Sequence, residues 1–392
     1  MLTAIAGSLI TVTGTVFSVT IVALQLASSQ FTPRLLRSFV ADRVNQTVLG
    51  IFIGTFTYTL LVLRTIRSAA GDLVTFVPQV GVSVALLLLL VSIGALIVFI
   101  NHAAQSIRAP VILHRATQRT LAVVETLFPE RVGRPDTAQE RAWRAHPAPA
   151  DPPALVEASE AGYLQAVHAE TLWRIGQGRH VGTLTVRMEL HIGSFAFPGK
   201  PLASVWPSHA VDDAIVNAIR EAFVLGAERT PEQDMEFGIV ELSDIAVRAL
   251  SPGINDPTTA VQCIDRLTQV LAALGTRNPP ATRRESPDGA VHLLVRSTSF
   301  DRATGLAFDQ IRHYGADNPA ITKKLLDALA DLARVVASEA RPALEAQAAA
   351  LARTARNSIE DPTDLAAVER LIAGVLGADR VRDEHGATGA AP

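Results

Sequence analysis

The sequence is poor in cysteine and in lysine. The cysteine count excludes one kind of framework, and the balance of charge excludes one class of partner. Among its 392 residues Cys263 is the single cysteine, so an internal disulfide framework is excluded. Cys263 lies in a helical apolar pattern, which predicts an inert thiol that only packs. Basic residues are almost all arginine, the formal net charge is -3, and no basic field stands out. A nucleic-acid partner is therefore not expected.

Three stretches lack charged residues altogether and predict membrane spans: Ile5–Ala27, Thr47–Leu63 and Val80–Ile100. About 20 apolar residues suffice to cross the hydrocarbon core as a helix. The first stretch is too long for the apolar part of a signal peptide and has no cationic region before it, so we expect a retained span. Because no span contains Asp, Glu, Lys, Arg or His, a proton-coupled pump is not expected.

The arginines on the connections predict the orientation of the spans. The first connection and the segment after the third span carry more arginine than the connection between spans two and three. By the positive-inside rule, we expect the first connection and the whole C-terminal region in the cytoplasm. The residues counted are Arg34, Arg37 and Arg43, then Arg108, Arg115 and Arg119, against Arg64, Arg67 and Asp72.

A polar stripe runs along the first span. Its members follow one another at steps of three and four residues, which places them on one helix face. Such residues pack and hydrogen-bond against neighbouring helices, as the GxxxG pattern of Gly50 and Gly54 also suggests. Alternatively, several subunits line a conduit with these hydroxyls. The candidate pore-lining residues are Ser8, Thr11, Thr15, Ser18 and Gln25, with Val22 on the same face.

Composition divides the chain into five parts. The expected fold is a membrane α-helical bundle with three spans, followed by a cytoplasmic α+β region that contains a small β module and helical hairpins. One or two amphipathic helices, interrupted near Pro110, follow the third span. The predicted parts are the transmembrane bundle with this juxtamembrane helix at 1–128, a proline-rich linker at 129–154, the β module at 155–207, a mainly helical domain at 208–378 and a disordered tail at 379–392.

The β module is predicted to be antiparallel, because β-prone clusters alternate with glycine and proline turns. Its stretch Gly193–Val205 resembles a turn and strand of lipoyl-like barrel-sandwich modules. No lysine lies at the hairpin position that carries the cofactor in those modules, since Lys200 belongs to the other turn. Biotin, lipoate or another cofactor is therefore not expected. The histidines lack the paired spacing of a metal site, and they are His168, His180, His191 and His209.

Helical patterns dominate the rest of the chain. A helix is predicted from a capping Ser208 to Leu225, and a second helix follows it. In the second helix Glu241, Asp244 and Arg248 form one polar seam, and the last two are spaced to pair as i and i+4. Farther on, residues 290–300 predict a strand, and the Asp361–Pro362 pair predicts another helix start.

The motif Ser251–Pro257, SPGINDP, predicts a helix stop, a reversal and a new helix start. Pro252 disfavours helical geometry before it, and we expect Gly253 to take a positive φ. Asp256 then caps the next helix, whose first residue is Pro257. The alternative is a site for a polar ligand or cation. Its candidate residues are Glu241, Asp244, Arg248, Ser251, Asn255 and Asp256.

Several stretches resemble an uncharacterised family of bacterial predicted membrane proteins. They are Ala4–Phe39 with its SSQFxPR motif, Val48–Arg67, Ala249–Leu267 with SPGINDP, and Ala307–Gly315. The resemblance implies an inner-membrane (plasma-membrane) protein with an N-terminal helical bundle and a cytoplasmic C-terminal region. Family members carry one further hydrophobic span ahead of the first matching stretch, whereas this chain begins at Met1 just inside it.

Three hypotheses of function follow. The leading one is an oligomeric, channel-like conduit with a cytoplasmic regulatory domain, whose partners are the lipid bilayer and further copies of the chain. The alternative is a membrane-anchored ligand-binding or scaffold protein. The third is a membrane enzyme that uses Asp244, Arg248 and Asp256. No histidine or nucleophile is tied to these carboxylates by spacing, so catalysis is the least favoured of the three.

Overall fold

The structure is a computed structural model in which the chain divides into two compact units, Met1–Ile112 and Leu113–Pro392. We call these the three-helix unit and the second unit and describe each by itself. The described residues are 1–30, 42–66, 78–106, 108–128, 151–176, 183–277, 283–286, 291–296 and 298–386.

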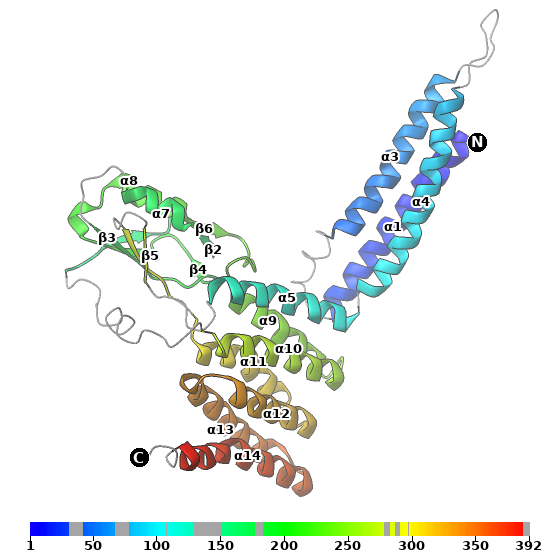
Figure 1. The fold of residues 1–392 in the computed structure, drawn as a ribbon. Coiled ribbons are helices and arrows are strands. Elements are labelled where there is room, and N and C mark those ends of the chain that lie inside the picture. The colour runs from blue at the N-terminus through cyan, green and yellow to red at the C-terminus, as the bar shows by residue number, and fades with distance from the viewer. Residues whose placement is uncertain are drawn as a thin grey trace, which may run out of the picture. The chain divides into compact units, whose positions relative to one another are not determined.

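Among its described residues the first unit contains three helices that are long and apolar enough to cross a membrane. They are α1 (Leu2–Gln30), α3 (Arg43–Thr65) and α4 (Gln79–Ser106). The charge-free stretches of the sequence lie within them, which confirms the three predicted spans by length and composition. The helices pack together around Leu9, Phe52 and Phe99 (Figure 1).

Polar contacts in the three-helix unit are few and specific. Ser92 on α4 donates its hydroxyl to Thr55 Oγ1 on α3 at 3.1 Å, within the buried contact of the two helices. At the start of α3 the carboxylate of Asp42 accepts from the backbone N–H of Val44 at 2.9 Å. The same carboxylate lies 2.9 Å from Nε2 of His102 and so joins the start of α3 to the end of α4.

The amphipathic helix predicted after the spans is α5 (Ala109–Leu127). It starts beside Pro110, where proline is tolerated because the first helical amides have no partner within the helix. Its buried face carries Leu113, Ala116 and Val124. The predicted interruption near Pro110 is confirmed, since α4 ends at Ser106.

Two small sheets follow. The five-stranded sheet has the order β1 (Ala154–Glu157), β5 (Pro201–Trp206), β3 (Leu184–Met188), β8 (Val291–Leu294) and β7 (Arg283–Glu285). The three-stranded sheet has the order β4 (Phe195–Ala196), β2 (Gly162–Val167) and β6 (Phe223–Gly226). Along β3 the residues Leu184, Val186 and Met188 are buried, in the alternation expected of a strand with one face in a core. Helices α7 (Ala169–Gly176) and α8 (Asp213–Ala222) pack against each other.

The prediction of an antiparallel β module within 155–207 was wrong in two respects. Strand β8 pairs with β3 in parallel, with Val186 opposite Leu293, so the sheet is mixed. Strands β6, β7 and β8 also come from beyond residue 207. Strand β8 is a strand of the predicted segment 290–300, but its partner is about a hundred residues away, and composition carries no signal for pairing over such a separation.

The helix predicted from Ser208 to Leu225 is shorter than expected. Residues Ser208–Ala210 form a 3-10 turn, and α8 begins after Asp212, whose carboxylate accepts from Ile215 N at 2.8 Å. The helix ends at Ala222, and Phe223–Gly226 continues as strand β6 beside β2. Aromatic and β-branched residues fit a half-buried strand, and β2 supplies the pairing that a helix pattern does not reveal.

Six helices complete the second unit in stacked layers (Figure 1). They are α9 (Met235–Ala249), α10 (Pro257–Gly275), α11 (Phe300–Tyr314), α12 (Pro319–Val335), α13 (Arg341–Ser358) and α14 (Pro362–Gly386). Helix α9 packs against α10 and α11, α10 packs against α12, and α12 packs against α13 and α14. The predicted Asp361–Pro362 start is confirmed, because the carboxylate of Asp361 accepts from Thr363 N at 2.7 Å.

The predicted tail, residues 379–392, is partly helical. Helix α14 continues to Gly386, so Asp379–Gly386 is helical where we expected a disordered tail. No proline interrupts this stretch, and its arginine and glutamate residues favour helix. Residues 387–392 lie outside the described part of the chain, as does most of the predicted linker, residues 129–150.

Candidate functional site

The SPGINDP motif forms the predicted reversal between α9 and α10. Helix α9 ends at Ala249, and the backbone N–H of Asp256 donates to the carbonyl of Ala249 at 2.7 Å. Within the turn the N–H groups of Ile254 and Asn255 donate to the carbonyl of Ser251 at 3.0 and 2.9 Å. The motif therefore satisfies its backbone groups locally.

The positive φ of this reversal lies at Asn255 and not at Gly253. Asn255 has a φ of 48°, whereas Gly253 is not among the glycines with positive φ, so our prediction for Gly253 was wrong. Asparagine enters the left-handed region more readily than most residues that carry a side chain. Glycine was the expected residue because it has no Cβ that opposes a positive φ.

Asp256 caps α10 as predicted. Its carboxylate accepts from the backbone N–H of Thr259 at 3.0 Å and also from the Thr259 hydroxyl. These two hydrogen bonds hold the pKa of Asp256 below its usual range. Behind the cap Cys263 is fully buried, and burial raises the pKa of its thiol, as expected for an inert packing cysteine.

The predicted polar seam of α9 does not share one environment. Glu241 is buried, and its carboxylate lies 3.3 Å from the guanidinium of Arg119 on α5. Asp244 is half-buried and Arg248 is exposed. The turn thus brings Ser251, Asn255 and Asp256 together, while Glu241 is engaged with α5. That the six residues also bind a ligand stays a prediction.

The polar stripe of α1 lies on the outside of the three-helix unit. All five predicted pore-lining residues are exposed, and Thr11 and Thr15 donate their hydroxyls to carbonyls of their own helix. The opposite face of α1, with Leu9 and Val16, enters the core with α3 and α4. Gly50 and Gly54 on α3 are likewise exposed with open space around them. The stripe is therefore not a contact with α3 or α4.

Two buried carboxylates at the start of α9 escaped the sequence reasoning. Asp234 caps α9 by accepting from Phe237 N at 2.9 Å, and Arg229 Nε donates to the same carboxylate at 2.8 Å. Glu236 accepts from Arg302 Nε at 2.6 Å and from the hydroxyl of Thr298 at 2.8 Å. The Asp-x-x-Phe spacing could have revealed the cap. The distant Arg302 gave no signal.

The environments of these two carboxylates differ. Burial raises the pKa of Asp234 in spite of the opposing charge of Arg229. Burial also acts to raise the pKa of Glu236, but the hydrogen bonds from Arg302 and Thr298 outweigh it, so its pKa lies below the usual range. Each carboxylate already accepts from an arginine and from one further donor, which is Phe237 N for Asp234 and the Thr298 hydroxyl for Glu236. This is the arrangement of a structural ion pair.

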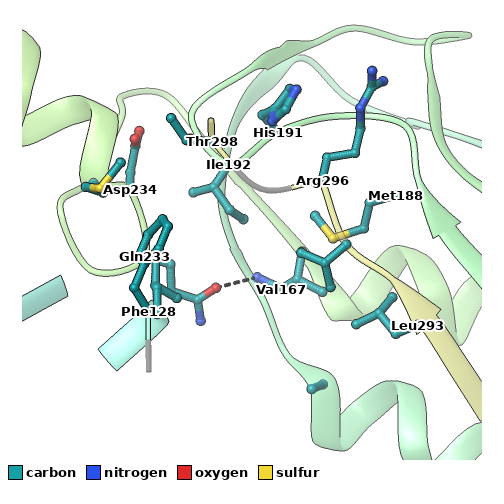
Figure 2. A pocket seen from close by; sticks show the side chains of 14 residues that line it. Phe128, Val167, Met188, His191, Ile192, Gln233, Asp234, Leu293, Arg296 and Thr298 are labelled. Atoms are coloured by element: carbon teal, nitrogen blue, oxygen red, sulfur yellow. Dashed lines mark hydrogen bonds between the residues drawn. The ribbon is translucent and has the colours of Figure 1, made fainter. Parts of the chain in front are cut away.

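A pocket of about 100 Å³ lies beside this cluster, within the second unit (Figure 2). The end of α5, strands β2, β3 and β8, and the start of α9 contribute its walls. The apolar residues are Leu127, Phe128, Val167, Ala169, Met188, Ile192, Met235, Leu293 and Val295, and the polar ones are His191, Gln233, Asp234, Arg296 and Thr298.

Gly193 brings the turn after β3 close to the pocket. It has a φ of 83°, and a side chain at this position would meet Asp234 and Arg229. Next to it Gln233 accepts from Val167 N at 3.1 Å, as Figure 2 shows. These contacts fix the wall between the strands and α9.

Two polar side chains of the pocket have spare hydrogen-bonding capacity. Nδ1 of His191 is buried and has no partner within the described part of the chain. Burial lowers the pKa of His191, which keeps the ring neutral near pH 7. Arg296 donates to the backbone carbonyl of Glu189 at 2.9 Å, and no carboxylate of a described residue forms an ion pair with it.

Residues 1–331 match the profile of the family described as "Predicted membrane protein (DUF2254)". The chain belongs to this family. This confirms the resemblance expected from the sequence. The family's membrane character agrees with the three apolar helices.

Similar proteins include the uncharacterized protein Rv1290c of Mycobacterium tuberculosis and the uncharacterized protein Mb1321c of Mycobacterium bovis. Each is 35% identical to this chain over 374 residues, which is 94% of this chain and 70% of the relative. No solved structure matches the chain.

Proposed function

We propose that this DUF2254 member is a membrane-anchored ligand-binding protein whose second unit takes up a small molecule in the pocket of Figure 2. The observation that carries the proposal is the pocket itself. Its walls are mainly apolar, and a few polar groups converge on it from several elements. Small-molecule sites in proteins have this composition.

A packing defect is a poorer explanation of this pocket. Protein interiors are close-packed, and voids larger than a water molecule are few. A buried polar atom without a partner costs about 1–3 kcal/mol, yet Nδ1 of His191 is such an atom beside the pocket. A ligand that fills the space and meets this atom would remove both costs.

The exposed surface of the first unit supports a multi-pass arrangement in a bacterial inner membrane. In the described part of the chain, most large hydrophobic side chains that are exposed lie on α1, α3 and α4, Phe17, Leu87 and Leu90 among them. Lipid suits such a surface better than water. The arginine count on the connections favours a cytoplasmic second unit.

Helix α5 supplies a route from ligand to membrane. It begins at Ala109, directly after α4 ends at Ser106, and its last residue Leu127 lines the pocket together with Phe128. A ligand that contacts these two side chains would act on the helix that leads to the spans. We therefore expect ligand binding to regulate the membrane part.

The proposal is tested with the full chain in detergent micelles and a library of small molecules, by thermal unfolding. A ligand at one hundred times its Kd stabilises by about 2.7 kcal/mol. Since each 1 kcal/mol shifts the Tm of a unit of this size by about 2–4 °C, the Tm should rise by roughly 5–10 °C. Ala169→Leu adds a larger side chain to the pocket wall and should abolish the shift.

Ala366→Leu is the matched control, because Ala366 is exposed on α14. This variant should keep the wild-type shift. The proposal fails if no compound stabilises the wild type, or if every stabilising compound acts equally on both variants.

A second candidate function, the oligomeric channel-like conduit, is favoured by the outward polar stripe of α1. Ser8, Thr11, Thr15, Ser18 and Gln25 are exposed on the three-helix unit. Polar groups that face lipid are unfavourable, whereas other copies of the chain could gather these hydroxyls around a common axis. In this hypothesis the second unit regulates the conduit.

Liposome flux tests the conduit. Purified wild type should conduct, and Thr15→Leu and Ser18→Leu should reduce the flux because they replace hydroxyls of the stripe. Val19→Leu is the control, since Val19 is an exposed apolar residue of the same helix. Absence of flux in the wild type, or equal flux in all four proteins, would rule out the conduit.

A further inference from the structure

We infer that the pocket takes a small organic anion, with an apolar body and one carboxylate that binds Arg296. This inference rests on the proposed ligand-binding function and names the chemical class of its ligand. It is carried by the local charge balance, by the hydrogen-bonding state of two side chains and by the size and lining of the pocket.

Among the described residues around the pocket, one arginine forms no ion pair with a carboxylate. Each carboxylate near the pocket that the structure describes has an arginine of its own within ion-pair distance. The pairs are Arg187 with Glu189 at 2.7 Å, Arg229 with Asp234 at 2.7 Å and Arg302 with Glu236 at 2.6 Å. Arg296 is the fourth arginine, and its hydrogen bond goes to a backbone carbonyl. The site therefore has room for one negative charge.

Arg296 has the donors that such a charge needs. A guanidinium carries five N–H donors, and its planar fork matches a carboxylate. The bond from Nη1 to the carbonyl of Glu189 uses one of them. Arg296 shares the field of the Glu189 carboxylate with Arg187, which forms the ion pair with it. A cationic ligand would be repelled by the charge of Arg296. A neutral ligand would form no ion pair with Arg296.

His191 supplies a second polar contact on the same side of the pocket. In Figure 2 the side chains of His191 and Arg296 lie at one side, and Phe128 lies at the other. The neutral ring of His191 has its buried Nδ1 without a partner in the described part of the chain. Depending on its tautomer, Nδ1 can donate to a carboxylate oxygen or accept from a hydroxyl of the ligand.

The apolar walls set the size of the ligand body. In Figure 2 Phe128 and Leu293 lie apart from the Arg296 side chain, whereas Met188 lies beside it. These three apolar side chains would contact an alkyl chain or a ring. A volume of about 100 Å³ holds roughly seven to ten water-sized groups. Branched or aromatic monocarboxylates such as isovalerate and benzoate have this size.

The test compares acids with their neutral amides on the full chain in detergent. The probes are benzoate, isovalerate and hexanoate against benzamide, isovaleramide and hexanamide, with Kd measured by calorimetry. Because hydrogen bonds to charged groups are worth more than neutral ones, the acids should bind at least about tenfold more tightly than their amides.

Arg296→Gln should weaken the acids by at least about tenfold and leave the amides nearly unchanged. The matched control is Arg220→Gln, because Arg220 on α8 also donates to a backbone carbonyl, that of Glu157 at 3.0 Å, and does not line the pocket. It should bind like the wild type. Thermal unfolding of both variants without ligand verifies that they are folded.

The outcomes separate this inference from the function on which it rests. Amides that bind as tightly as acids, or acids that bind Arg296→Gln as tightly as wild type, overturn the inference while ligand binding stands. The same holds if the small-molecule library gives a pocket ligand but none of the six probes binds. If no compound of any kind binds, the proposed function itself fails.

Discussion

The two units of this protein treat polar side chains in opposite ways. In the three-helix unit the described hydroxyls mostly donate to carbonyls of their own helix, and Ser92 with Thr55 forms a contact between helices without formal charge. In the second unit α9 and its N-cap bury three carboxylates, those of Asp234, Glu236 and Glu241. Each of these carboxylates is bound by an arginine from outside the helix.

This difference shows which contacts join the segments of the second unit. Arg119 comes from α5 and Arg302 from α11, so two segments distant in sequence converge on α9, while Arg229 comes from the loop that leads into this helix. Buried ion pairs contribute little net stability, but a pair that loses one partner is strongly destabilising. Such contacts therefore define which segments meet. In the three-helix unit, apolar packing and hydrogen bonds within each helix hold the helices together instead.

Removing the carboxylate of Asp234 should give the largest effect. Asp234→Ala deletes both the cap of α9 and the partner of Arg229, so we expect a loss of about 3–5 kcal/mol in the free energy of unfolding. Chemical denaturation of the full chain in detergent measures it. Asp234→Asn keeps a capping oxygen and should lose less. Equal losses would mean that the cap contributes nothing and that the whole loss comes from the ion pair with Arg229.

The contact between α5 and α9 should be nearly as sensitive. A Cβ at Gly238 would collide with the Thr120 hydroxyl, so Gly238→Ala should cost about 1–3 kcal/mol, although alanine favours helix.

The control for this contact is Gly253→Ala in the exposed turn, where nothing lies within 4 Å of the added atom. Because Gly253 does not have a positive φ, the replacement should be neutral or slightly stabilising. A loss at Gly253 as large as that at Gly238 would contradict the assignment of the positive φ to Asn255.

Glu236→Gln should lower stability by about 1–2 kcal/mol near pH 7, a value reduced because the partner Arg302 is half-exposed. The folded pKa of Glu236 lies below the ordinary value of 4.5, so its charge stabilises the fold above that value. This contribution is lost as the pH falls through the folded pKa. The difference in Tm between wild type and variant should therefore stay nearly constant from pH 7 to about pH 5 and shrink as the pH falls below 4.5. A difference that does not shrink below pH 4.5 would contradict the ion pair.

The cap of α10 should have a smaller effect. Asp256→Ala removes the acceptor of Thr259 and should cost about 1 kcal/mol, and Asp256→Asn should cost less because asparagine also caps helices. Ligand binding and any turnover by the chain should survive both changes. A loss of activity in Asp256→Asn at unchanged stability would favour the enzyme hypothesis.

The smallest effect is expected in the three-helix unit. Ser92→Ala removes the hydrogen bond to Thr55, and such bonds between spanning helices average about 0.6 kcal/mol. Steric trapping in bicelles measures it. A loss comparable to that of Asp234→Ala would erase the contrast between the two units.

The sequence predicted the features that depend on neighbouring residues. The three spans follow from charge-free runs, and the caps at Asp256 and Asp361 follow from Asp-Pro pairs. The family was also recognisable from its motifs. Each of these signals is contained in a short window of the chain.

The rest could not be predicted because it depends on distant residues. The parallel pairing of β3 with β8, the partners of the α9 carboxylates and the pocket all join segments far apart in sequence. Asn255 shows a local limit, since glycine and asparagine were both available for the left-handed position. The polar stripe was recognised, but the side of α1 that packs against α3 and α4 was not.

The central claim is that the second unit binds a small molecule in the pocket formed by α5, the strands and α9. An experimental structure of the full chain with the most stabilising compound of the library tests it most directly. We predict density for that compound in contact with Phe128, Met188 and His191. Density for the compound elsewhere, with this pocket empty or closed by protein side chains, would contradict the account.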